Sequence, residues 1–310
     1  MAIKSPLTTF GTESSGRLRA VMLHKPMVSI TNMNAVTAGY YMFDQVPDAE
    51  QFLAEHERYK ALLLHHQIEV YELADFVQKN KAEMNVLASL AYLHDSSVIT
   101  RDGAVLSKMG FGRVGEDIVV KEALTNLGVP IFYEFAEADH FEGFLILSPR
   151  TAFIACTERH RPVSVEKFIS YALTLFPEII YVDVVKARRY MHADMLFGKI
   201  NDNLALVYLP ALLKGWLITQ NDRQEIADFR QFMFERQMEL ISVSDEEQQQ
   251  WACSFIPLDA KTMFHYDIAL NAQTKKRLNS NGIEIIEFHP HALLAGGGSL
   301  RCLTLMLLRE

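Results

Sequence analysis

Cysteine is scarce in this chain, and the three cysteines that occur stand far apart. Cys156, Cys253 and Cys302 are an odd number spread over 310 residues. This spacing fits neither a disulfide framework nor the close pairs of cysteines that bind structural zinc. Residues 1–6 also lack the apolar stretch of a secretory leader. Together these absences predict a reduced, cytoplasmic protein.

The chain also lacks an excess of positive charge and any long apolar run. Its formal net charge is -8, and no cluster of Lys and Arg could follow a phosphate backbone, so we expect no nucleic acid partner. No apolar stretch is long enough to cross a bilayer, so we expect no membrane partner. With 49% hydrophobic and 22% charged residues, the composition is globular and the length is ample for a large core.

No linker rich in Pro, Gly or Ser divides the chain, which predicts one domain over residues 1–310. A first strand is predicted at Leu18–His24, before Pro26. After it, a helix followed by a strand is predicted five times. The five pairs are Asp48–Gln67 with Ile68–Leu73, Val119–Leu127 with Val129–Phe135, Val165–Phe176 with Glu178–Val184, Arg223–Met238 with Glu239–Val243, and Ala272–Leu278 with Gly282–Phe288.

Pairs of short strands lie between these units, such as Phe144–Leu147 with Thr151–Ala155. The repeated unit is therefore two strands, a helix and a strand. Five such ββαβ units in one chain predict an α/β fold that closes into a ring, because closure hides the sheet edges. An ordinary α/β sheet shows similar alternation and is the alternative interpretation.

The end of the chain holds the first candidate for chemistry. Gly296–Gly298 are three consecutive glycines, which permit a positive φ and a close approach of the backbone to a ligand. The run Cys302–Leu308 is apolar enough for a buried strand. Because a thiolate is a strong nucleophile, Cys302 at this junction is a candidate for covalent catalysis. The alternative is a small core residue beside a glycine turn.

Three further stretches carry polar residues that strand ends do not need: Tyr92–Val98, His140–Phe144 and Arg188–Phe197. A ring would bring them to one end of its axis. His192 and Asp194 are two positions apart, so on a strand they would share a face. A histidine beside a carboxylate is typical of a general acid and base.

Asp95, Glu142 and Asp194 would place several carboxylates in one pocket, where like charges repel unless a cation binds. A guanidinium fits this role, because it is always charged and pairs with carboxylates through two hydrogen bonds. A metal ion is the alternative, but the sequence lacks the usual ligand spacings. Taken singly, residues such as Asp95 and Glu142 are more often turn or cap residues, but together with His192 and Cys302 they favour a functional site.

The order and spacing of these motifs resemble the arginine deiminases of the guanidino-group-modifying (pentein) superfamily over most of the chain. The matching segments are Gly16–Pro26, Met42–Pro47, His94-Asp95, Glu142-Gly143, Thr157–Arg159, Lys186–Phe197, Arg301–Thr304 and Leu308–Glu310. The resemblance implies a five-bladed α/β propeller of pseudo-fivefold ββαβ repeats. It also implies a cysteine-dependent hydrolase that converts arginine or a related guanidine into a ureido product and ammonia, without metal or organic cofactor.

The resemblance further implies a role for each site residue. These are Cys302 as the nucleophile, His192 as the acid and base, Glu142 as its partner, Asp95 and Asp194 as the guanidinium clamp, and Arg159 and Arg113 as holders of a substrate carboxylate. The residues expected around the substrate differ from those of the deiminases. Leu145, Gly297, His94 and Arg301 stand where deiminases have other residues.

Two other functions use the same fold. An amidinotransferase would pass the amidino group to an amine, and a non-catalytic binding protein would not need Cys302. The expected partner is a small guanidino substrate, and a homo-oligomer is left open.

Overall fold

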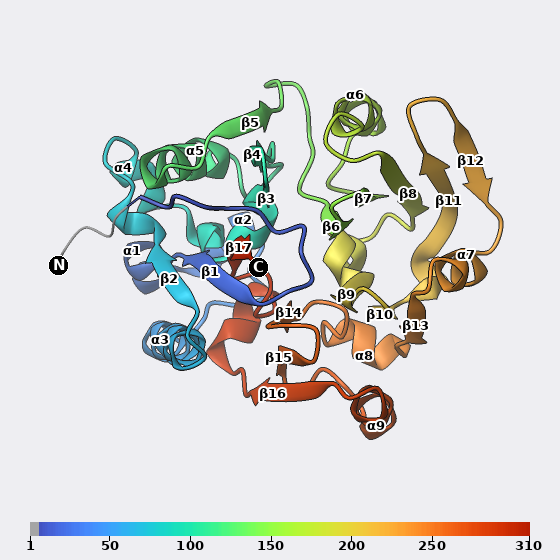
Figure 1. Ribbon diagram of the computed structural model, residues 1–310. Helices are drawn as coiled ribbons and strands as arrows, with labels where there is room; N and C mark the ends of the chain where they lie inside the picture. The colour runs from blue at the N-terminus through green and yellow to red at the C-terminus, as the bar shows by residue number, and fades with distance from the viewer. Residues whose placement is uncertain (1–5) are drawn as a thin grey trace. The chain divides into compact units, whose positions relative to one another are not determined.

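The computed structural model describes residues 6–310, coloured along the chain in Figure 1. Residues 1–5, which belong to the segment examined above for a leader, lie outside the described residues. The chain packs into two compact units, and the prediction of one domain over residues 1–310 stays a prediction. The first unit comprises Met1–Thr12 as far as it is described, Leu18–Glu137 and Phe288–Glu310, and the second comprises Glu13–Arg17 and Ala138–Glu287.

The first sheet of the first unit joins the two ends of the chain. Strand β1 (Leu18–Leu23) pairs antiparallel with β17 (Leu305–Arg309) and parallel with β2 (Glu69–Glu72). The parallel connection runs through α3 (Ala49–His65), drawn in blue beside β2 in Figure 1. Helix α3 begins where the side chain of Asp48 accepts the N–H of Gln51, which satisfies a donor at the helix N-terminus.

The second sheet of the first unit repeats this pattern. Strands β3 (Ser97–Thr100) and β4 (Gly103–Leu106) form an antiparallel pair, and β5 (Ile131–Glu134) lies parallel to β4. Helix α5 (Glu116–Leu127) joins β4 to β5 and ends at Gly128, whose φ of 99° suits a residue without a Cβ. The buried residues of α5 recur at helical spacing and pack into one hydrophobic cluster with residues from β1 to β4 and β17.

The second unit contains a five-stranded sheet and two three-stranded sheets. The five-stranded sheet contains β6 (Leu145–Ser148), β7 (Thr151–Cys156), β8 (Glu178–Val184), β11 (Leu212–Ile218) and β12 (Arg223–Ile226). The next sheet contains β9 (Phe197–Asn201), β10 (Leu204–Val207) and β13 (Glu239–Ser242). The last sheet contains β14 (Ile256–Pro257), β15 (Thr262–Tyr266) and β16 (Glu284–Phe288). Helix α6 (Pro162–Ala172) connects β7 to β8 within the first of these sheets, and α9 (Ala272–Ser280) connects β15 to β16 within the last. Helix α7 (Phe229–Glu235) leads from β12 of the five-stranded sheet to β13 of the next.

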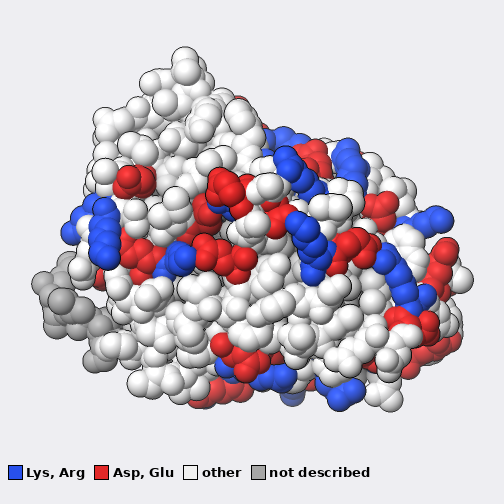
Figure 2. Space-filling view, turned by 90° about the horizontal axis from the view of Figure 1, so that it is seen from above, with Lys and Arg blue, Asp and Glu red and all other residues white. Residues whose placement is uncertain are grey.

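The remaining helices are short. They are α1 (Met27–Thr31), α2 (Ala35–Tyr40), α4 (Lys81–Met84) and α8 (Asp245–Gln249). No helix within residues 6–310 is long and apolar enough to cross a membrane. On the face drawn in Figure 2, acidic and basic side chains lie interspersed, and the described basic residues seen there form no continuous band.

Four of the five predicted helix–strand pairs are confirmed and the fifth is confirmed in part; the α/β composition is confirmed. The strands of residues 6–310 form five separate sheets, none of them closed, so the five-bladed propeller stays a prediction. The helix predicted over Arg223–Met238 begins only at Phe229, because Arg223–Ile226 pairs with β11 as strand β12. Here pairing between strands overrides local helical spacing.

Candidate active site

Cys302 lies in a tight turn, not at the start of a strand as predicted. Strand β17 begins only at Leu305, because the backbone from Ser299 to Thr304 forms its own hydrogen bonds first. The N–H of Leu303 bonds the carbonyl of Ser299 at 3.3 Å, and the N–H of His94 bonds the carbonyl of Cys302 at 3.0 Å. Cys302 is buried. The thiol is therefore carried by a rigid turn fixed from both sides.

The glycine run is explained by the ring of Tyr92. A Cβ at Gly296 or Gly298 would collide with this ring, and Gly297 between them has a φ of 70°. The hydroxyl group of Tyr92 donates to the carbonyl of Leu293 at 3.0 Å. Burial raises the pKa of Tyr92, so this side chain is neutral and serves as an apolar support for the turn of Cys302.

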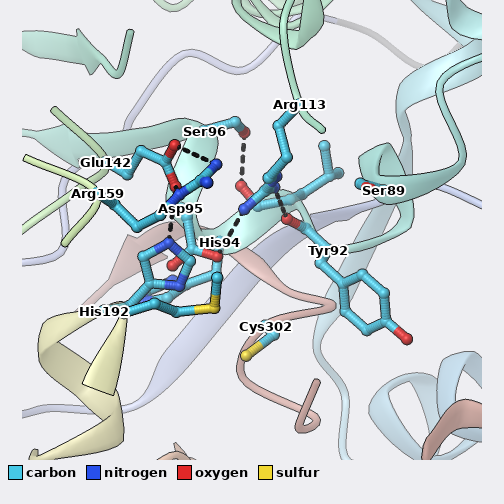
Figure 3. A network of polar contacts seen from close by, with 12 residues as sticks. Ser89, Tyr92, His94, Asp95, Ser96, Arg113, Glu142, Arg159, His192 and Cys302 are labelled. Atoms are coloured by element: carbon cyan, nitrogen blue, oxygen red, sulfur yellow. Dashed lines mark hydrogen bonds and ion pairs between the residues drawn. The ribbon is translucent and has the colours of Figure 1, made fainter. Parts of the chain in front are cut away.

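Asp95 is bound to an arginine within the first unit, as Figure 3 shows. Arg113 NH1 lies 3.0 Å from Asp95 Oδ2, and Arg113 Nε and NH2 lie 3.0 and 2.9 Å from Glu116 Oε2. NH2 also donates to the carbonyl of Tyr92 at 2.5 Å. All three ionic side chains are buried. The guanidinium of Arg113 is therefore held by two carboxylates of the chain itself.

Glu142 is positioned in the second unit by its aromatic neighbours. Phe141 and Phe144 are buried, and both rings contact Phe168 on α6, with centroids 4.8 and 5.3 Å apart. Gly143 between them has a φ of 75°, which a residue with a side chain rarely adopts. The sequence Phe-Glu-Gly-Phe therefore fixes the backbone of Glu142 by packing on either side of it.

Two basic side chains meet on the Glu142 carboxylate, as Figure 3 shows. His192 Nε2 lies 2.9 Å from Oε2, and Arg159 places Nε 2.9 Å from Oε2 and NH2 2.7 Å from Oε1. Burial works to raise the pKa of Glu142, but the hydrogen bond from His192 and the charge of Arg159 outweigh it. The pKa of Glu142 therefore lies well below its usual range, and the group is ionised.

The loop that carries Arg159 is tied to the segment that carries His192. The hydroxyl of Thr157 donates to the carbonyl of Met191 at 2.5 Å and accepts from the N–H of Arg159 at 3.2 Å. One threonine thus holds both segments next to Glu142. The resemblance around Thr157–Arg159 pointed to this loop, but it did not predict the contact with Met191.

His192 and Asp194 do not lie on a strand. Residues Ala193–Met195 form a 3-10 helix with His192 at its N-terminal boundary, so the shared strand face that was predicted does not exist. This turn leads into β9, where regular strand pairing begins only at Phe197. Asp194 is buried and accepts a hydrogen bond from the hydroxyl of Ser254.

The predicted site residues thus form a group in each unit. In the first, Asp95 contacts Arg113, and Cys302 lies in the turn supported by Tyr92; in the second, Glu142 contacts His192 and Arg159. The two arginines predicted to hold a substrate carboxylate are both paired with carboxylates of the chain. Sequence reasoning missed Glu116, Ser254 and Ser299, and of these Ser299 directly follows the glycine run Gly296–Gly298 that was singled out.

Neither unit, taken alone, brings three ligand-type side chains to metal-binding distance among residues 6–310. The prediction of a reaction without metal or cofactor stays a prediction.

Two curated proteins are similar to almost the whole chain. YkgA of Bacillus subtilis (strain 168), an uncharacterized protein, is 24% identical over 308 residues, which cover 99% of this chain and 97% of that protein. An arginine deiminase of Borreliella afzelii (strain PKo) is 21% identical over 397 aligned positions, which cover 95% of this chain and 96% of the deiminase.

Two solved structures share the fold. The chain matches AgrE, solved with ornithine and NAD+, with a TM-score of 0.71 and 18% identity over 94% of its length, but it spans only 39% of AgrE. It matches the N-terminal domain of ArgZ, an arginine dihydrolase of cyanobacteria, with a TM-score of 0.71 and 16% identity, covering 92% of this chain and 97% of that domain. By sequence the chain is thus similar to the arginine deiminases, and by fold it is similar to AgrE and ArgZ.

A family model described as N,N dimethylarginine dimethylhydrolase, eukaryotic, matches residues 117–309. This range is more than half of the chain, and the chain therefore belongs to that family.

Proposed function

We propose that this chain is a cysteine-dependent hydrolase that converts arginine or a related guanidine into a ureido product and ammonia. Relatives and family are named as arginine deiminase and dimethylarginine hydrolase, so the chain is an enzyme of the general class that hydrolyses guanidino C–N bonds. The particular substrate and the covalent intermediate on Cys302 are our proposal.

The observation that carries the proposal is the buried contact between His192 and Glu142, at 2.9 Å. An ionised carboxylate next to an imidazole favours the protonated ring and fixes its orientation. A protonated imidazole can give its proton to the nitrogen that leaves the guanidino group. Without such a proton donor, this nitrogen is a poor leaving group. Because Glu142 has an unusually low pKa, it can support this charge throughout the neutral range.

The reaction would proceed in two halves. The thiolate of Cys302 attacks the central guanidinium carbon, His192 donates its proton to the departing nitrogen, and the C–N bond breaks to leave an amidino-thioether. Neutral His192 then takes a proton from water, the hydroxide attacks the same carbon, and the C–S bond breaks. The ureido product gives its extra proton to ammonia or solvent water as it leaves, and the enzyme returns with a thiolate and a protonated His192.

Asp95 and Asp194 are the proposed clamp for the guanidinium group. Both are buried, and a cationic substrate would compensate their charges and favour the thiolate over the thiol. Arg159 and Arg113 would hold a substrate carboxylate only by leaving or sharing the carboxylates that they bind now. A comparison of L-arginine with agmatine, which lacks the carboxylate, tests this part: equal turnover of both rules out the carboxylate clamp.

A screen of guanidino compounds for ammonia release, followed by product analysis, tests the function as a whole. A ureido product with free ammonia supports hydrolysis, whereas turnover that requires an added amine identifies an amidinotransferase. Cys302→Ser should lose turnover and keep its fold, since a hydroxyl is far less ionised than a thiol. Retention of more than about a tenth of the activity would exclude Cys302 as the nucleophile, because loss of a nucleophile normally costs many orders of magnitude.

The five separate sheets fit the proposal that the chain folds as one five-bladed propeller. An experimentally determined structure tests that arrangement. A homo-oligomer and a cytoplasmic location stay predictions from the sequence.

A further inference from the structure

The side chain of Ser299 makes three contacts on the turn that carries Cys302. Its Oγ accepts hydrogen bonds from the backbone N–H groups of Arg301 and Cys302, at 3.1 and 3.3 Å. The same oxygen lies 3.5 Å from Cys302 Sγ, within the range of a hydrogen bond to sulfur. Ser299 has no exposed surface, so bulk water does not compete for these contacts.

The two backbone contacts decide which role the hydroxyl group can play toward the sulfur. A serine hydroxyl carries one hydrogen and two acceptor lone pairs. Backbone N–H groups can only donate, so Arg301 and Cys302 use the acceptor capacity of Ser299 Oγ. The hydroxyl hydrogen can then be donated to Cys302 Sγ, and a thiolate is a stronger acceptor than a thiol because hydrogen bonds to ionised groups are the stronger ones.

A simpler interpretation is that Ser299 only caps a turn. The N–H of Leu303 bonds the carbonyl of Ser299, so residues 299–303 form one helical turn, and serine is a frequent residue at such a position. Ser244 does this in the second unit, where its Oγ accepts the N–H of Glu247 at 3.2 Å at the start of α8. A cap requires only an acceptor, so it predicts no influence on a neighbouring sulfur.

Other polar side chains of the first unit lie next to this turn. Tyr92, which packs against Gly298 in this turn, is kept neutral because burial raises its pKa. The Nε of Arg301 donates to Nε2 of His94 at 3.1 Å. Ser299 is the side chain of the turn whose donor lies at hydrogen-bond distance from the sulfur.

We propose that Ser299 is a further catalytic residue, whose hydroxyl donates a hydrogen bond to the sulfur of Cys302 and stabilises the attacking thiolate. This inference rests on the proposed role of Cys302 as the nucleophile. The hydrogen bond from the Cys302 N–H to Ser299 Oγ holds the hydroxyl group next to the sulfur. The stabilisation of the thiolate is therefore present before substrate binds.

The test follows alkylation of Cys302 by iodoacetamide as a function of pH in the folded full-length protein, with the modified peptide quantified by mass spectrometry. Buried Cys156 and Cys253 serve as internal references for intact folding. In Ser299→Ala the midpoint of the pH profile should rise by about one unit, which corresponds to about tenfold slower alkylation below the midpoint. Ser299→Thr keeps the hydroxyl group and should react like the wild-type protein.

Ser299→Gly separates the two interpretations and guards against loss of folding in Ser299→Ala. Glycine is tolerated at a cap position far better than alanine, but it has no side chain that could donate to the sulfur. We expect a raised midpoint with nearly unchanged thermal stability. Ser244→Ala is the matched control, in which stability falls and the Cys302 profile stays unchanged. A wild-type midpoint in both Ser299→Ala and Ser299→Gly would reduce Ser299 to a cap and overturn the inference.

Alkylation reports on the sulfur without any turnover, so the two proposals fail separately. A shifted midpoint combined with full activity of Cys302→Ser would keep the hydrogen bond but remove the proposed function. An unshifted midpoint combined with an inactive Cys302→Ser would keep the function and remove the role of Ser299.

Discussion

Replacing Arg159 by alanine distinguishes an internal ion pair from a substrate clamp. Both oxygens of Glu142 accept from the guanidinium of Arg159, at 2.9 and 2.7 Å, and the Glu142 side chain has no exposed surface. Without Arg159, this buried carboxylate would keep His192 but lose its forked partner. Breaking a buried ion pair by removing one member typically costs about 3–5 kcal/mol, because a buried charge is left poorly compensated.

We therefore expect the free energy of unfolding of Arg159→Ala to fall by about 3–5 kcal/mol at neutral pH, measured by urea denaturation at equilibrium. The loss should shrink as the pH falls below about 4.5, the ordinary pKa of a glutamate. The sign follows from the depressed pKa of Glu142: its stabilisation is present above the unfolded value and is lost as the pH falls toward the folded value. In Arg159→Ala with Glu142→Gln, most of the loss should be recovered.

Arg277→Ala is the matched control in the same unit. Arg277 NH2 contacts Glu239 Oε1 at 3.3 Å, but the two side chains are 46% and 52% exposed, so its loss should cost about 1 kcal/mol or less. If Arg159→Ala is no more destabilising than Arg277→Ala, the reasoning from burial is wrong. If in addition KM for arginine rises by tens- to thousands-fold while agmatine is unaffected, Arg159 holds the substrate carboxylate instead.

Three further outcomes are expected. His192→Ala should lose both formation and breakdown of the covalent adduct, as followed by single-turnover mass spectrometry, and a variant with the wild-type pH–rate profile would contradict its role. Gly298→Ala should destabilise the fold by about 1–3 kcal/mol or more, because its Cβ meets the ring of Tyr92; unchanged thermal unfolding would contradict that packing. Burial lowers the pKa of His24 to about 3 and of His56 to about 4, so the unfolded chain binds more protons below pH 6.5 and stability should fall with acidification. In a pH series of urea titrations, replacing His24 by leucine should make the free energy of unfolding fall less steeply on acidification. An unchanged slope would refute the assignment.

Local patterns in the sequence were sufficient for the elements of the fold. The hydrophobic spacing of α5 and the alternation in β2 depend on neighbours a few residues away, so they can be recognised without knowing the tertiary structure. The prediction at Arg223–Met238 was wrong where the structure depends on a partner outside the local segment. Residues Arg223–Ile226 become strand β12 because β11 offers hydrogen bonds, and helical spacing carries no information about that partner.

The sequence by itself determined which residue types could supply the chemistry: a thiol after a glycine run, a histidine, and several carboxylates. Only the tertiary structure decided how they pair. Glu142 and His192 are 50 positions apart, and the choice of Glu142 as the partner of Arg159 depends on the loops that Phe168 and Thr157 hold in place. An ion pair forms with whichever opposite charge lies within a few ångströms, and in a buried setting that distance is fixed by packing, which no spacing along the chain records.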